Sequence, residues 1–202
     1  MLNDLIIDEL QSAALEYLGK HLDKHYTYHN VGHTLEVCSA VKLFAENSNL
    51  ASDVYYALRI AAVFHDFGYL ESSSDNEKLA LPYIEDFGRR WNIAGDILRA
   101  AYNMVLETVF PYQPTTLAGQ ILCDADVEYI GRDSFLKKAE LFRRELAGEG
   151  MVFTEREWWK FELNFLQSNM FFSPACRSLR DAGRLRNLEK VEALLLKIEM
   201  EG

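Results

Sequence analysis

Cysteine is scarce in this chain of 202 residues, and its three copies lie far apart. Cys38, Cys123 and Cys176 form no close pair, and their odd number fits neither a disulfide framework nor a cysteine-based zinc site. Such sparing use of cysteine is typical of proteins in a reducing compartment. We therefore expect the protein to be cytoplasmic.

Long apolar runs and an excess of basic residues are missing as well. No uninterrupted apolar stretch is long enough to span a bilayer, and the N-terminal MLNDLIIDEL lacks the basic start and cleavage site of a signal peptide. The formal net charge of −10 argues against a nucleic-acid polymer, because proteins that bind one usually carry basic surfaces. We expect no membrane and no nucleic-acid polymer as partners. A small phosphorylated substrate fits, and the sequence leaves open a homo-oligomer.

The sequence also lacks an alternating strand pattern of convincing length, and it contains no internal repeat. Apolar residues instead recur at helical spacing, which predicts an all-α fold with roughly eight or nine helices in a single domain, 1–202. The predicted helices cover residues 2–18, 31–47, 52–67, 93–108, the stretch that carries Asp124 and Asp126, 133–147, 154–170 and 174–199.

Glycine, proline and short polar residues predict where these helices begin and end. Pro82 predicts a kink or break near Leu81, and Thr154 with Glu157 predicts a capping box. The other predicted stops are Gly19, Gly68 and Gly131, the other predicted caps are Ser52, Asp75 and Thr115 or Thr116, and the last helix is expected to break at Gly183.

The stretch AAVFHDFGY, residues 61–69, carries the main chemical signal. His65 and Asp66 end its apolar run, and unpaired polar groups in a core are expensive. A metal ion would satisfy both side chains. Matching ligands occur in YHNVGH, residues 28–33, and in CDAD, residues 123–126. The sequence therefore predicts that these three stretches meet around a divalent cation.

The order His33, His65-Asp66, Asp126 resembles the H…HD…D signature of the HD-domain superfamily of metal-dependent phosphohydrolases. The longer stretches YHNVGHTLEV, AAVFHDFGY and ILCDADVEYIGRDSF are similar to small, stand-alone bacterial members, and looser matches extend over about residues 20 to 190. The resemblance implies an HD-domain helical bundle, with the motifs in about 20–130 and helices of 133–200 packed on that part.

The resemblance also implies site residues. It makes His33, His65, Asp66 and Asp126 the ligands of one divalent ion, and two imidazoles with two carboxylates suit manganese, iron, cobalt, nickel, magnesium or zinc. Asp124, two residues before Asp126, would then orient a ligand or a water molecule.

Three further residues receive roles by the same comparison. His29 matches the histidine that protonates the leaving oxygen in the phosphodiesterase branch, although it could equally be a helix-start histidine without chemistry. Glu77 could hold a metal-bound water or lie on a solvated helix face. Arg132 is a weak candidate for binding substrate phosphate.

We expect a metal-dependent phosphohydrolase that acts on a nucleotide or another small phosphate ester through an activated water, with Asp66 helping to orient that water. Monoester and diester substrates remain alternatives. A catalytically silent HD-like binding or interaction module is the other interpretation, although such modules usually lack one of the four ligands. Related proteins often carry further histidines that would serve a second metal. At those places this chain has Asp75-Asn76-Glu77 and Thr108, which favours one metal over a two-iron, oxygen-activating site.

Overall fold

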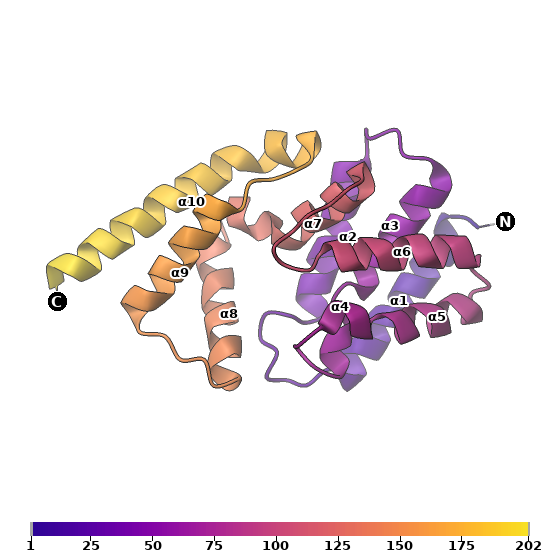
Figure 1. The fold of residues 1–202 in the computed structure, drawn as a ribbon, viewed down its shortest axis with the longest axis horizontal. Helices are drawn as coiled ribbons and strands as arrows, with labels where there is room; N and C mark the ends of the chain where they lie inside the picture. Colours follow the sequence, from indigo (N-terminus) through magenta and orange to yellow (C-terminus); the bar gives the residue numbers. More distant parts are fainter. Residues whose placement is uncertain (1, 202) are drawn as a thin grey trace. The chain divides into compact units, whose positions relative to one another are not determined.

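The computed structural model describes residues 2–201, in which helices joined by loops and turns are present and no β-strand occurs. The predicted all-α class is therefore confirmed. Ten α-helices are present in these residues, and α4 is only one turn long, so nine are longer than a turn. The elements (Figure 1) are α1 Asp4–His21, α2 Val31–Ala45, α3 Ser52–Phe64, the 3₁₀-helix η1 Phe67–Leu70, α4 Asn76–Leu79, α5 Leu81–Arg90, α6 Gly95–Glu107, α7 Leu117–Val127, the 3₁₀-helix η2 Glu128–Gly131, α8 Phe135–Gly148, α9 Glu155–Ser168 and α10 Pro174–Glu201.

These helices form two compact units. Unit 1 contains the described residues up to Lys24 together with His29–Asp126, and unit 2 contains His25–Tyr28 and the described residues from Val127 onward. The motif-bearing helices α1 to α7 thus belong almost wholly to unit 1, and α8 to α10 belong to unit 2. That 133–200 pack on the motif-bearing part as a single domain stays a prediction.

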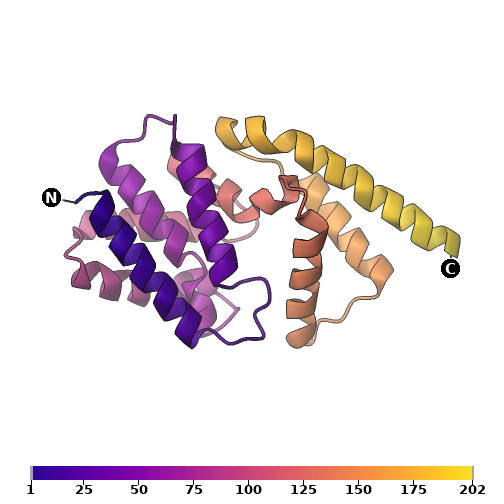
Figure 2. The same ribbon diagram turned by 180° about the vertical axis from the view of Figure 1, so that it is seen from behind.

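Helix α3 is the central element of unit 1. Every residue from Ala57 to Phe64 is buried, and α3 packs against α1, α2 and α6 (Figure 2). One of these residues is Arg59, which is 2% exposed and reaches the carboxylates of Asp4 and Asp8 on α1. A buried guanidinium needs such partners, so this charge cluster fixes α1 against α3.

The turn after α3 places the candidate ligands. The helix ends at Phe64, three residues before the predicted end, and His65 takes its C-terminal cap position. The chain then tightens into η1, where Gly68 lies so close to Asn76 that an added Cβ would be 1.9 Å from the Asn76 carbonyl oxygen. Gly68 therefore serves a close backbone contact rather than the end of α3.

Several predicted helix boundaries are confirmed. Pro82 stands in the first turn of α5, with the break from α4 just before it. The Thr116 hydroxyl accepts the Gly119 N–H at 3.0 Å at the start of α7, and Thr154 forms the capping box with Glu157.

Other boundary predictions are wrong. Helix α1 continues past Gly19 to His21, because the His21 ring stacks on Tyr17 at 4.1 Å and its Nδ1 bonds the Tyr17 carbonyl. Ala51, not Ser52, occupies the cap position of α3, and its carbonyl accepts the Tyr55 N–H. Asp75 precedes α4 in the left-handed region without capping it, since its carboxylate pairs with Lys78 instead.

The predicted break at Gly183 is also wrong, because α10 runs unbroken through it. Gly183 packs against η2 of the same unit, and a Cβ there would lie 1.9 Å from the Gly131 carbonyl oxygen. The glycine permits close approach of two backbones, which outweighs its cost within a helix.

Gly183→Ala is therefore expected to destabilise unit 2 by about 1–3 kcal/mol, although alanine is the better helix former. Urea unfolding followed by the fluorescence of Trp158 and Trp159, both on α9, would measure the loss. Ala182→Gly, on the exposed side of the same helix, is the control and should cost no more than about 1 kcal/mol. A Gly183→Ala variant as stable as the wild type would contradict the contact.

Candidate metal site

Three segments of unit 1 bring the predicted ligands together. His33 lies in the first turn of α2, where the Asn30 side chain accepts the backbone N–H groups of Gly32 and His33. His65 and Asp66 follow α3 directly, and Asp126 lies near the end of α7. Each ligand position is thus set by a helix end that the local sequence determines.

The tautomer of His65 is fixed by its surroundings. This side chain is 1% exposed, and its Nδ1 lies 2.9 Å from the Ala62 carbonyl oxygen, which can only accept a hydrogen bond. Nδ1 therefore carries a proton, and Nε2 is the ring nitrogen that faces the other candidate ligands. A backbone partner at the second ring nitrogen is the usual arrangement for a metal-binding histidine.

The facing side-chain atoms lie at distances that suit a shared cation. His33 Nε2 is 3.2 Å from His65 Nε2, 3.3 Å from Asp66 Oδ2 and 3.1 Å from Asp126 Oδ1. His65 Nε2 is 3.1 Å from Asp66 Oδ2 and 3.6 Å from Asp126 Oδ1. Ligands held about 2.0–2.2 Å from one ion lie about 2.8–3.6 Å apart in octahedral or tetrahedral geometry. His33, His65 and Asp66 could therefore bind a single divalent ion, and Asp126 lies against the two histidines.

The chemistry of this cluster also fits a cation. Asp66 Oδ2 is buried and has no hydrogen-bond partner among the described residues, although two imidazole nitrogens lie next to it. An ionised oxygen left in that state is costly unless a positive charge compensates it. His33, His65 and Asp66 could together hold a metal ion, and Asp126 extends the same group.

Protons compete for these ligands. Burial alone would lower the pKa of His65, but the carboxylates of Asp66 and Asp126 outweigh it and raise that pKa well above its usual range. The pKa of His33 is raised for the same reason. Burial works in the opposite direction on Asp66, yet the neighbouring imidazoles hold its pKa well below the usual value. Without a metal, the cluster therefore retains protons on imidazole near neutral pH.

Metal affinity is accordingly expected to rise with pH between 6 and 8, by about tenfold per pH unit for each imidazole proton displaced. Calorimetric titration of the protein with Mn²⁺ in two buffers of different ionisation enthalpy would count these protons. The wild-type protein should release at least one proton per ion at pH 6.5. Binding of equal strength at both pH limits, without proton release, would contradict the assignment of the two histidines.

His29 lies beside the ligand cluster in a half-buried position. Its ring is 5.7 Å from that of His33 and stacks on Tyr69 at 4.4 Å, with Tyr69 Oη 3.3 Å from His29 Nε2. Tyr112 donates a 3.5 Å hydrogen bond to Asp126 Oδ2 from the loop before α7. Sequence reasoning missed both tyrosines. Tyr69 belongs to the central motif, but only the stacking and bonding partners identify its role.

Two candidate supporting residues also lie in unit 1. Glu77 stands half-buried in α4, where burial and then the Asp66 and Asp126 carboxylates raise its pKa, so it lies near both of them. Asp124 is fully buried on α7, two residues before Asp126. The supporting roles of Glu77 and Asp124 stay predictions. Arg132 follows η2 in unit 2, where its guanidinium pairs with Glu128, and its role in binding substrate stays a prediction.

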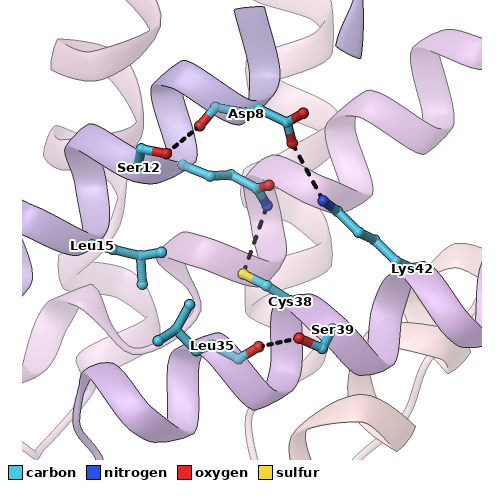
Figure 3. Close-up of a pocket in the computed structure, with 8 residues that line it drawn as sticks. Asp8, Ser12, Leu15, Leu35, Cys38, Ser39 and Lys42 are labelled. Carbon is cyan, nitrogen blue, oxygen red and sulfur yellow. Dashed lines mark hydrogen bonds and ion pairs between the residues drawn. The ribbon is translucent and has the colours of Figure 1, made fainter. Parts of the chain in front are cut away.

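A hollow in unit 1, of about 280 Å³, lies between α1 and α2, away from the ligand cluster (Figure 3). Its rim carries the Asp8–Lys42 ion pair at 3.3 Å, and Gln11 Nε2 lies 3.6 Å from Cys38 Sγ at its floor. Burial raises the pKa of the Cys38 thiol to about 12, so this cysteine is not a nucleophile at neutral pH. The hollow thus offers no thiol chemistry, and the ligand cluster remains the candidate site.

Comparison with known proteins supports the fold. No protein-family model matches the chain, and no curated protein sequence matches it. Among solved structures, the chain is similar to the crystal structure of the Lin1889 protein of Listeria innocua. The two share 14% sequence identity over 98% of each chain, with a TM-score of 0.69. At this identity the likeness shows a shared fold. In addition, no helix of the described residues is long and apolar enough to cross a membrane.

Proposed function

We propose that this protein is a metal-dependent phosphohydrolase of the HD-domain superfamily, acting on a nucleotide or another small phosphate ester. The observation that carries the proposal is the cluster of His33, His65, Asp66 and Asp126, in which the Nε2 atom of each histidine lies 3.1–3.6 Å from a carboxylate oxygen of both aspartates. Two imidazoles and two carboxylates match the ligand set that the motif order implies. The ligand set is complete, which supports an enzyme over a silent binding module.

The four ligands would hold one divalent ion, which when bound lowers the pKa of a water ligand and polarises a phosphoryl oxygen. Asp66 would orient the attacking water with its carboxylate. Tyr112 restrains Asp126 through Oδ2, so Oδ1 keeps its position toward the histidines. His29 would donate a proton to the departing alkoxide, and Tyr69 Oη against Nε2 keeps that ring in place.

The experiment that tests this proposal is a substrate screen with Mn²⁺, Co²⁺, Ni²⁺, Mg²⁺ and Zn²⁺ in turn, using nucleoside monophosphates, cyclic nucleotides and p-nitrophenyl esters. Turnover that depends on the ion and is lost with chelator is the expected result. If the protein binds about one ion per chain but turns over no ester in the panel, the binding-module interpretation becomes the better one.

The role of His29 has its own readout in this assay. Losing a general acid costs about 10²–10⁴-fold with an alkoxide leaving group, but far less with p-nitrophenolate, which leaves without protonation. His29→Gln should therefore slow a nucleotide ester much more than a p-nitrophenyl ester. Equal losses on both substrates would mean that His29 does not protonate the leaving group.

A further inference from the structure

Helix α10 has two faces of apolar character, and only one of them is covered within unit 2. Its inner face, which includes Cys176, Gly183, Val191 and Leu195, is buried where the helix packs against α9 and η2. Figures 1 and 2 both show α9 lying along α10. At 100° per residue, the opposite side of the helix carries a second row of residues.

This second row, the outer stripe, steps along the helix by three or four residues at a time. Its apolar members are Ala182, Leu185, Ala193, Leu196 and Met200, and the carboxylate of Glu189 interrupts the row at its middle. Leu185 is 51% exposed, Leu196 is 63% exposed and Met200 is 88% exposed. Single exposed apolar residues are ordinary, but a row at this spacing is the pattern of a helix that packs on another helix.

Charges flank the outer stripe by sign. Arg186, Lys190 and Lys197 lie along one edge, and Asp181, Glu192 and Glu199 lie along the other. In a parallel helix pair, a residue on one edge faces the residue five positions later on the opposite edge of the partner. Asp181 would then face Arg186, and Glu192 would face Lys197. An antiparallel pair would instead bring like edges together.

We propose that the outer stripe of α10 binds the same stripe of a second copy of this chain, forming a parallel, two-fold symmetric helix pair. A self-complementary patch is what such an isologous contact requires. The stripe supplies the apolar contact, and the oppositely charged edges set the direction of pairing. It spans only about 27 Å of helix and brings the two Glu189 carboxylates together, so the dimer is expected to be weak, with a Kd of about 1–50 µM. This contact is independent of the metal site.

Sedimentation equilibrium of the whole chain at about 2–200 µM tests the proposal. The wild type should show a concentration-dependent dimer, and Leu196→Glu should weaken it at least about a hundredfold because one buried leucine is lost on each side. Leu179→Glu is the matched control, since Leu179 is 49% exposed on the same helix but lies a quarter turn away from the stripe. A wild type that stays monomeric throughout, or a dimer that Leu196→Glu leaves unchanged, would overturn the proposal.

The direction of pairing is tested by Met200→Cys under mild oxidation. In a parallel pair the two copies of position 200 face each other and should join as a disulfide-linked dimer. In an antiparallel pair they lie at opposite ends of the contact and should not. The native cysteines Cys38, Cys123 and Cys176 are all buried, so they should not contribute to cross-linking of the folded protein. A dimer that fails to cross-link through position 200 would overturn the parallel arrangement.

Discussion

Asp66→Asn is expected to remove metal binding from unit 1 while the chain stays folded. The substitution keeps the shape of the side chain but removes the charge of the oxygen that lies 3.1 Å from His65 Nε2 and 3.3 Å from His33 Nε2. Asparagine is a poor ligand for a divalent ion in a site of this kind, and loss of even a supporting residue typically costs 10–100-fold in affinity. We expect the loss for this ligand to be at least about a hundredfold.

Elemental analysis of purified protein, followed by titration with Mn²⁺ or Zn²⁺, measures this effect directly. The wild type should hold about one ion per chain, and Asp66→Asn should hold almost none. Asp75→Asn is the matched control, because Asp75 is an exposed aspartate nine positions after Asp66, and its carboxylate pairs with Lys78. Its metal content should equal that of the wild type. Full metal content in Asp66→Asn, with the fold intact by circular dichroism, would refute the assigned ligand set.

The ligand cluster is the part of the molecule that sequence reasoning predicted best. Its residues are set by local signals, because Asn30 caps α2 before His33 and the apolar run of α3 ends directly at His65. Each of these signals lies within a few residues of the ligand it places. The meeting of the three segments is a tertiary event, and it was predicted from their matching metal ligands and from the resemblance of the motif order to a known family.

The features that sequence reasoning missed depend on contacts between distant segments. Gly183 looks like a helix break in the sequence, and only the approach of the Gly131 carbonyl explains why a glycine lies inside an unbroken helix. Tyr112 belongs to a loop rich in proline and threonine, and no local pattern links it to Asp126. A glycine or a tyrosine takes its role from what it touches, and the neighbours in both cases lie more than ten residues away.

Glu162 is expected to make the stability of unit 2 fall as the pH rises. This carboxyl on α9 is 1% exposed, its Oε2 has no hydrogen-bond partner among the described residues, and Trp158 and Leu166, one turn to either side, are fully buried. Burial, with a smaller contribution from the Glu140 carboxylate, raises the pKa of Glu162 to about 8. In the unfolded chain the pKa returns to about 4.3.

The sign of the effect follows from proton binding. Between the unfolded and the folded pKa, the folded state binds more protons than the unfolded state, so the free energy of unfolding decreases with rising pH. The decrease is up to about 1.4 kcal/mol per pH unit. It should begin near pH 4–5 and be complete above about pH 8, where the buried carboxyl must ionise for the fold to persist.

Glu162→Gln isolates this contribution, because glutamine resembles the protonated carboxyl in size and polarity but does not titrate. Urea unfolding followed by fluorescence of Trp158 and Trp159 should give nearly equal stabilities for variant and wild type at pH 5. At pH 9 the variant should be more stable by about 2–5 kcal/mol. Glu155→Gln, an exposed position on the same helix, is the control and should follow the wild type at both values. A constant difference in the free energy of unfolding between Glu162→Gln and wild type across this range would show that the carboxyl has the same pKa in the folded and unfolded states. Burial would then not control that pKa.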